Sequence, residues 1–164
     1  MVTIAGSSPG YAGDNGPATA ATLNGPYGIA VDALGDVFVA DTFNSVIRKI
    51  TLDGKIQTIA GTGVAAFGGE GTAATSTPLA YPYGVEVDAV GNVFIAEEYR
   101  IRKVGVNGII STIAGNGVTP NDGLAYSSAI GPIVALAMDK SSNLYLADSY
   151  YNMVRMISPQ GNIR

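Results

Sequence analysis

The chain repeats itself three times. The tetrapeptide Thr-Ile-Ala-Gly stands at residues 3–6, 58–61 and 112–115, about 55 residues apart. Each copy is followed by a stretch rich in Gly, Ala and Thr, and then by apolar segments in the same order. A repeat of this length is one structural unit that cannot bury its apolar surface alone, so neighbouring units must stack. The repeat therefore predicts an array of equivalent units that forms one domain over residues 1–164.

Each unit has the pattern of four β-strands. Apolar and β-branched residues recur with period two in short segments separated by Gly, Asn or Asp, which predicts antiparallel hairpins. In the first copy the predicted strands are Gly28–Asp32, Val37–Asp41, Val46–Thr51 and Lys55–Ala60. The long link ahead of each first strand carries Ala and Thr with one leucine, Leu23 or Leu79. It predicts a short helical turn that packs this leucine against the sheet.

These segments resemble a known family. The run Pro26–Asp32, followed by Val37–Asp41, Asn44 and Ile47-Arg48-Lys49, resembles the NHL repeat, and the preceding Thr-Ile-Ala-Gly is similar to its bacterial form. The resemblance implies an all-β fold, a β-propeller of four-stranded antiparallel blades, with three blades at about 24–60, 80–114 and 131–164. The second copy has a shorter hairpin between strands two and three, and the third lacks the Tyr-Gly of the first strand. Both departures argue against a symmetric ligand site.

Three blades cannot close a ring, since propellers have about four to eight. A free arc would expose the apolar faces of its end blades, and such patches are typical of association surfaces. NHL relatives usually form six blades, so we expect two copies to close a six-bladed ring as a homodimer. Thr3–Gly6 of one chain would then complete the last blade of the other. A fragment of a longer ring is the alternative, and boundaries at repeat junctions are also typical of an excised or engineered half-propeller.

The composition excludes several chemistries. The chain has no Cys and no His, which removes disulfides, thiolate metal sites, cysteine nucleophiles and the commonest general base and zinc ligand. Its formal net charge is −4 and it has no run of Lys or Arg, so a nucleic-acid groove is not expected. No uninterrupted apolar stretch is long enough to span a bilayer. We therefore expect no enzyme activity, no cofactor, and neither a nucleic-acid nor a membrane partner.

Two kinds of charged residue recur in the copies. One repeat position holds Arg48, Arg102 and Arg155. Asp41 and Asp148 precede the first and last of these by the same interval, which predicts ion pairs between strands two and three, with a ligand-binding arginine as the alternative. The first strands end in Asp32, Asp88 and Asp139. These carboxylates predict hydrogen bonds to turn amides, with a Ca²⁺-binding ring as the alternative.

The second copy adds Glu86 where the others have alanine. Because first strands line a propeller channel, Glu86, Glu97 and Glu98 are candidates for an acidic patch at the channel mouth, and three carboxylates suit a hard cation. A solvated channel wall is the structural alternative, and we assign no metal site. The resemblance implies that related six-bladed hydrolases and lyases hold Ca²⁺ or Zn²⁺ through His or Asn. A calcium-dependent propeller enzyme is therefore the alternative function.

Aromatic residues are placed to form a binding rim. The hairpins between strands two and three share one rim with the links in a propeller, and rings exposed there suit flat contacts with a peptide, protein or sugar. The candidates are Phe43, Tyr99, Tyr150, Tyr151, Tyr27 and Tyr83. For Tyr27 and Tyr83, packing between blades is the alternative. The sequence thus predicts a non-catalytic NHL-type scaffold or binding module that also binds a second copy of itself.

Overall fold

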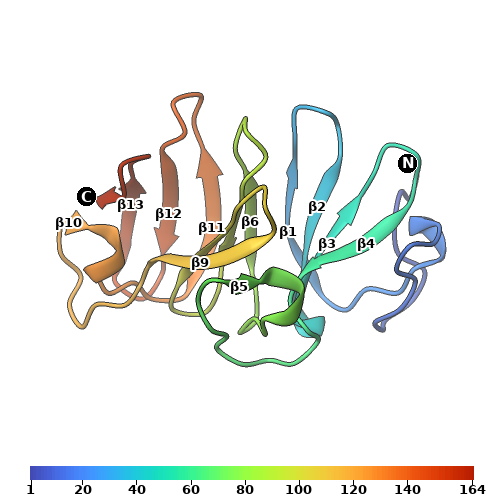
Figure 1. Cartoon of the computed structure of the whole chain (residues 1–164), viewed down its shortest axis with the longest axis horizontal. Helices are drawn as coiled ribbons and strands as arrows, with labels where there is room; N and C mark the ends of the chain where they lie inside the picture. The colour runs from blue at the N-terminus through green and yellow to red at the C-terminus, as the bar shows by residue number, and fades with distance from the viewer.

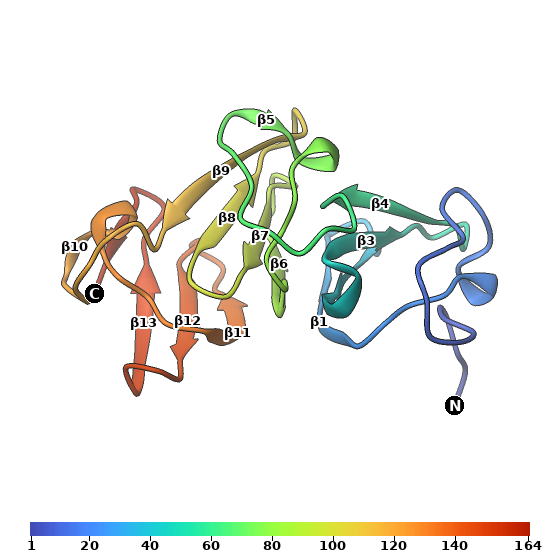
Figure 2. The same cartoon turned by 90° about the horizontal axis from the view of Figure 1, so that it is seen from below.

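Three antiparallel sheets stand side by side along an arc in this computed structural model, which describes residues 1–164 (Figures 1 and 2). The first sheet has the strand order β1-β2-β3-β4. Its strands are β1 (Pro26–Val31), β2 (Val37–Asp41), β3 (Val46–Ile50) and β4 (Ile56–Ala60). The predicted all-β architecture of antiparallel hairpins is confirmed, with strand limits that differ from the expected ones by at most two residues at either end.

The second and third sheets have five strands each, in the orders β5-β9-β8-β7-β6 and β10-β14-β13-β12-β11. The second sheet contains β5 (Thr72–Ala73), β6 (Gly84–Val87), β7 (Val93–Ala96), β8 (Ile101–Val104) and β9 (Ile109–Ala114). The third contains β10 (Gly123–Leu124), β11 (Ile133–Met138), β12 (Leu144–Asp148), β13 (Met153–Ile157) and β14 (Asn162–Ile163). The expectation of four strands is wrong for these two sheets, because the link before each first strand pairs with the outer strand and adds a short fifth one.

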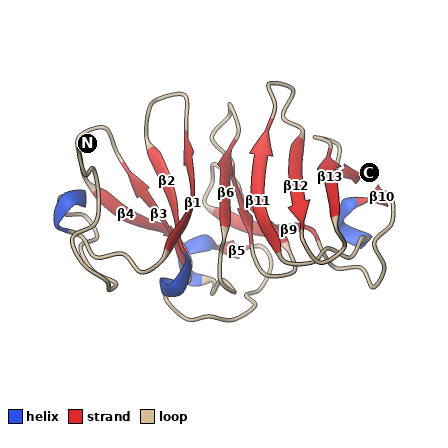
Figure 3. Ribbon diagram, turned by 180° about the vertical axis from the view of Figure 1, so that it is seen from behind, coloured by secondary structure: helices blue, strands red, loops and turns tan.

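Each link also forms the predicted short helical turn. The turns are η1 (Ala18–Ala20), η3 (Ala74–Ser76) and η4 (Ala125–Ser127), and a further turn, η2 (Thr42–Asn44), lies in the hairpin between β2 and β3 (Figure 3). Leu79 is fully buried between the first two sheets, as expected for the link leucine. No helix in the chain has the length and apolar character needed to cross a bilayer.

The core lies between neighbouring sheets. Phe38 and Ile47 of the first sheet pack on Val85 and Ile95 of the second. A second cluster joins the second and third sheets, and a smaller one packs the link around η1 against the first sheet. Stacking of adjacent sheet faces is therefore the main source of buried apolar surface, as a repeat array requires.

The two ends of the arc leave sheet faces uncovered. Ile29 on β1 is 67% exposed, whereas Val85 at the same repeat position is 3% exposed because it faces the first sheet. At the other end, Val154 on β13 is 79% exposed, whereas the equivalent Ile47 is fully buried. The same apolar positions are thus buried inside the arc and open to solvent at its ends.

Neighbouring inner strands approach so closely that one position needs glycine. A Cβ atom on Gly28 would lie 2.6 Å from the carbonyl oxygen of Tyr83 and 2.9 Å from the Cα of Gly84. Both atoms belong to the backbone at the start of the second sheet, so neither can turn aside. The absence of a side chain at Gly28 lets β1 and β6 pack at this distance.

Replacing Gly28 with alanine should therefore destabilise the chain by about 1–3 kcal/mol, because the added methyl group forces the two sheets apart. Gly69→Ala is the matched control, since a Cβ there meets nothing within 4 Å and the residue is not in the left-handed region. Its stability should be unchanged or slightly higher. Urea unfolding of both variants measures the difference, and an equal midpoint for the two would contradict the close-approach explanation.

Candidate functional site

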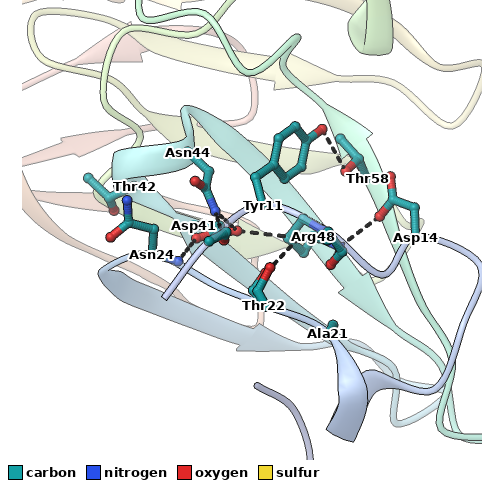
Figure 4. Close-up of polar contacts among 12 residues, drawn as sticks. Tyr11, Asp14, Ala21, Thr22, Asn24, Asp41, Thr42, Asn44, Arg48 and Thr58 are labelled. Atoms are coloured by element: carbon teal, nitrogen blue, oxygen red, sulfur yellow. Dashed lines mark hydrogen bonds and ion pairs between the residues drawn. The ribbon is translucent and has the colours of Figure 1, made fainter. Parts of the chain in front are cut away.

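Arg48 is fully buried and ties the first link to the first sheet (Figure 4). Its Nη2 donates to Oδ1 of Asp14 at 2.8 Å and to the carbonyl of Ala12 at 3.4 Å. Its Nη1 donates to Oδ2 of Asp41 at 3.4 Å and to the carbonyl of Thr22 at 3.5 Å. One guanidinium thus satisfies two carboxylates and two link carbonyls, and we call this arrangement the arginine clamp.

Asp41 has further partners that fix its carboxylate. The backbone N–H of Asn24 donates to Oδ1 at 2.7 Å, and the side-chain amide of Asn44 donates to Oδ2 at 2.8 Å. The predicted cross-strand pair of Asp41 and Arg48 is therefore confirmed. Since both side chains are fully buried and hydrogen-bonded, their role is structural and they offer no free charge to a ligand.

The clamp recurs in the other sheets with different partners. Arg102 is fully buried, lies 3.5 Å from Glu97 and donates to the carbonyl of Gly69 at 2.5 Å. Arg155 donates to the carbonyl of Asn121 at 2.6 Å and to the hydroxyl of Ser128 at 2.9 Å. In every sheet the repeated arginine binds backbone carbonyls of the link that precedes that sheet.

The prediction of an ion pair between Asp148 and Arg155 is wrong. Asp148 instead accepts hydrogen bonds from the backbone N–H groups of Gly131 and Tyr151, at 3.0 and 3.1 Å. Nη1 of Arg155, the atom that Arg48 directs to Asp41, donates instead to the Ser128 hydroxyl and to the carbonyl of Ala129. Equal spacing along the sequence was therefore not sufficient to predict the pair.

Sequence reasoning missed a carboxylate in each link. These residues are Asp14, Glu70 and Asp122, and each lies within 4 Å of the arginine of its own sheet, at 2.8, 3.6 and 3.8 Å. They occupy the same place in the three links, shortly before the helical turn. This recurrence was a usable signal, but it is hidden among links of unequal length and composition.

The aspartates that end the first strands are turn residues. Oδ1 of Asp88 accepts from the backbone N–H groups of Val90, Gly91 and Asn92 at 2.8–3.0 Å. Asp32 and Asp139 make equivalent bonds. At Asp88, burial acts to raise the pKa, but the hydrogen bonds from Asn92, Val90 and Gly91 together lower it below its ordinary value. At Asp139, the hydrogen bonds from Asn143 lower the pKa. The predicted hydrogen bonding to turn amides is confirmed.

The three glutamates proposed for the channel mouth do not form one cluster. Glu97 is fully buried and bonds to Arg100 at 2.9 Å as well as to Arg102. Burial raises its pKa, and the two arginines oppose that shift. Glu86 is half-buried with no ion-pair partner, and burial raises its pKa too. Nowhere in the chain do three acidic side chains converge on a common point that suits a metal ion.

Three of the predicted rim aromatics do converge. The rings of Tyr27 and Phe43 meet edge to face with centroids 6.0 Å apart, and those of Tyr27 and Tyr83 do so at 5.6 Å. We call Tyr27, Phe43 and Tyr83 the aromatic rim. Tyr27 contacts Tyr83 across the first two sheets, as the packing alternative predicted, yet Tyr27 and Phe43 both remain exposed.

The backbone around the aromatic rim holds it in place. The Thr42 hydroxyl donates to the carbonyl of Pro82 at 2.6 Å and so joins the η2 hairpin to the start of the second sheet. Gly25 has a φ of 58° and lies against the Phe43 ring, where a Cβ would clash. Tyr27 and Tyr83 also line a hollow of about 210 Å³ together with Val85, Val134 and Leu136 from the inner strands.

The other rim candidates lie apart from this group. Tyr150 and Tyr151 form their own edge-to-face pair with centroids 5.0 Å apart, at the hairpin between β12 and β13. Tyr150 is exposed and Tyr151 half-buried. Tyr99 is exposed in the shortened hairpin of the second sheet. The aromatic side chains thus gather unevenly, with the largest group spanning the first two sheets.

The model of the Teneurin NHL domain matches the chain twice, over residues 6–68 and 63–121. The chain belongs to this family. The NHL chain is 27% identical over 161 residues to teneurin-1 of Gallus gallus, covering 84% of the chain but only 6% of that relative. It is 28% identical to NHL repeat-containing protein 2 of Homo sapiens, covering 95% of the chain and 25% of the relative. The NHL chain thus spans a small part of the curated relatives that it matches.

Solved structures share its fold at low identity. A protein of unknown function from Bacteroides thetaiotaomicron superposes with a TM-score of 0.70 at 20% identity, covering 85% of the NHL chain and 37% of its own. Virginiamycin B lyase from Staphylococcus aureus superposes with a TM-score of 0.56 at 22% identity, covering 85% of the NHL chain and 40% of the lyase. A gluconolactonase from Xanthomonas campestris superposes with a TM-score of 0.61 at 12% identity, covering 85% of the NHL chain and 46% of the gluconolactonase. These likenesses support a propeller-type fold for the NHL chain.

Removing one arginine of the clamp should destabilise the fold strongly. In Arg48→Met the methionine keeps most of the side-chain volume, but Asp41 is left as a buried carboxylate without its cation, which costs about 3–5 kcal/mol. Lys55→Met is the control, because Lys55 pairs with Asp53 on the surface and such pairs contribute about 0–1 kcal/mol. Chemical unfolding measures both. A loss below 1 kcal/mol for Arg48→Met would show that the clamp is dispensable.

Proposed function

We propose that the NHL chain is a non-catalytic binding module whose aromatic rim holds a peptide segment of a partner protein. The observation that carries this proposal is the edge-to-face group of Tyr27, Phe43 and Tyr83, in which Tyr27 and Phe43 are exposed and Tyr83 is half-buried. Exposed aromatic rings are enriched at protein interfaces, where they bury a large area at a small entropic cost. The hydrogen bond from Thr42 to Pro82 holds the rings in position before a ligand arrives.

The charged groups near the candidate site are bonded to other parts of the chain, and this supports a module without catalysis. The repeated arginines bind link carbonyls, Glu97 binds two arginines, and the strand-end aspartates bind turn amides. None of these groups is free to act as an acid, base or metal ligand. The lyase and the gluconolactonase share only the fold at their low identities. With net charge −4 and buried arginines, nucleic acid is not a proposed partner.

A calcium-dependent propeller enzyme remains the alternative function, and the arrangement of the glutamates does not favour it. Glu97 would have to leave two arginines to join a cation site with Glu86. A calorimetric titration with CaCl₂ separates the two functions. Heat of specific binding at millimolar calcium would favour the enzyme.

We further propose that two copies of the chain close a six-bladed ring, in which each sheet is one blade. The support is the exposure of Ile29 and Val154 at positions that are buried inside the arc. The two end faces correspond to the two halves of an internal sheet–sheet interface, so a second copy offers each face its complement. The NHL chain also covers 37% to 46% of three solved chains of its fold, as expected for about half a ring.

Ring closure predicts a solution mass of twice 16.7 kDa. Light scattering at micromolar concentration should give this value, and Val154→Asp should return the mass to that of one chain because it places a charge in the interface. Leu52→Asp is the matched control, since Leu52 is equally exposed but lies in a turn, and it should stay dimeric. A folded wild-type monomer would overturn ring closure.

Peptide binding predicts that the aromatic rim selects ligands from a phage-displayed random peptide library. Enriched peptides should lose more than about tenfold in affinity for the Tyr27→Ala, Phe43→Ala double variant, because truncating an aromatic hot-spot residue costs about 2 kcal/mol or more. Leu34→Ala, an exposed residue at the opposite end of β1, should bind like wild type. Failure to enrich peptides, or equal binding by the double variant, would count against a peptide ligand.

A further inference from the structure

We infer that a pocket between the second and third sheets binds a small aromatic carboxylate, with the ring between the sheets and the carboxylate on Lys103. The pocket lies next to the turns between β6 and β7 and between β11 and β12, which stand at the same end of the arc (Figure 1). This end is opposite the aromatic rim, so the inference depends neither on peptide binding nor on ring closure.

Both neighbouring sheets line this inter-sheet pocket. Phe94 and Ile113 of the second sheet and Leu144 and Ile157 of the third form its apolar walls. The two side chains of the second sheet are half-buried, and the two of the third are buried. The volume is about 150 Å³, and an apolar cavity of this size holds one benzene-sized ring. The pocket therefore matches a single aromatic ring that contacts both sheets.

The junction between the first and second sheets gives an internal comparison. Phe38 holds the repeat position of Phe94, but it is only 4% exposed and belongs to the core. Lys49 on the next strand lies with its ammonium 5.2 Å from the centroid of the Phe38 ring, and it pairs with Asp36 at 2.7 Å. At this junction the ring is covered and the cation has its anion within the chain.

The second sheet keeps the cation but has lost the anion. The ammonium of Lys103 lies 5.6 Å from the centroid of the Phe94 ring, much as Lys49 lies over Phe38. Asn92 stands where the first sheet has Asp36, four residues after the strand-end aspartate. No carboxylate lies within 4 Å of Lys103. A positive charge without an ion-pair partner thus stands beside the half-buried ring.

A ligand carboxylate can take the place of the missing anion. Asp88 is the carboxylate in the lining, and its Oδ1 accepts three backbone N–H groups while its Oδ2 accepts the Asn92 amide at 2.7 Å. These bonds hold Asp88 in its own turn, so Lys103 is the charged group left to meet a ligand. The hydroxyl of Ser142 in the lining adds a further donor.

The ligand needs both a ring and a charge. A hydrogen bond from an ammonium to a carboxylate is stronger than one between neutral groups, and burial of the ring adds the hydrophobic contribution. A simple anion makes only the first contact and a neutral ring only the second. The two features together therefore select an aromatic carboxylate over either kind of molecule alone.

Titration of the isotope-labelled chain with sodium benzoate, followed by the NMR shifts of backbone amides, tests the inference. Benzoate should bind with millimolar affinity, as expected for so small a ligand, and should saturate the shifts of Phe94, Lys103 and Leu144. Benzamide keeps the ring without the charge, and acetate keeps the charge without the ring. Each should bind at least about fivefold more weakly.

Variants identify the cation. Asn92→Asp copies the first sheet, so the introduced carboxylate should pair with Lys103 and weaken benzoate binding about tenfold. Lys103→Met should weaken it equally, and both should bind benzamide like wild type. Lys49→Met is the matched control, because it removes the same charge at the same repeat position of the first sheet, and it should bind benzoate like wild type.

The opposite results would overturn the inference. They are equal binding of benzoate and benzamide, shifts that do not saturate, or wild-type binding of benzoate by Asn92→Asp and Lys103→Met. Shifts confined to Tyr27 and Tyr83 would place the ligand at the aromatic rim and would overturn the inter-sheet pocket as its site. A failure of peptide binding at the rim leaves these measurements unchanged, so the two proposals are tested separately.

Discussion

The arginine clamp is the interaction on which the rest of the structure depends. A long link must cross from the outer edge of one sheet to the inner edge of the next, and its backbone carbonyls need partners wherever water is excluded. A guanidinium offers five N–H donors in a fixed plane, so one buried side chain can satisfy several carbonyls and a carboxylate together. Arg48, Arg102 and Arg155 do this in the three sheets. The link then stays folded on the sheet, and its leucine can enter the core as Leu79 does.

Stacking of the sheets follows from that arrangement. With each link held, Leu79 and Ala74 fill the space between the first two sheets, and Gly28 lets the inner strands come within contact distance. The same stacking determines where function can reside. The repeated arginines, Glu97 and the aspartates after the first strands are bonded within the units, while Tyr27 at the start of the first inner strand remains exposed. The proposed binding of a peptide relies on these exposed rings and needs no acid–base or metal chemistry.

The sequence predicted the repeat, the hairpins and the helical turns of the links because each follows from local patterns. The period of two, the turn glycines and the Ala-rich links act over a few residues. It could not predict that Arg155 bonds to Ser128 instead of Asp148, because Ser128 lies 27 residues away in a link whose composition differs from the other two. The prediction that Glu97 lies at the channel mouth was also wrong, because Glu97 is buried in an ion pair with Arg100 from the shortened hairpin. Of the six aromatic candidates, Tyr27, Phe43 and Tyr83 form one group because Tyr27 contacts Phe43 within the first unit and Tyr83 at the start of the second.

Every repeated arginine bonds to the link of its own sheet and to no other. A gene segment that encodes one link and the strands after it therefore encodes both the buried arginine and the link groups that bind it. Duplication or deletion of such a segment changes the number of units in the protein without leaving a buried cation unpaired. Chains of this kind can therefore change their number of units by recombination of whole segments.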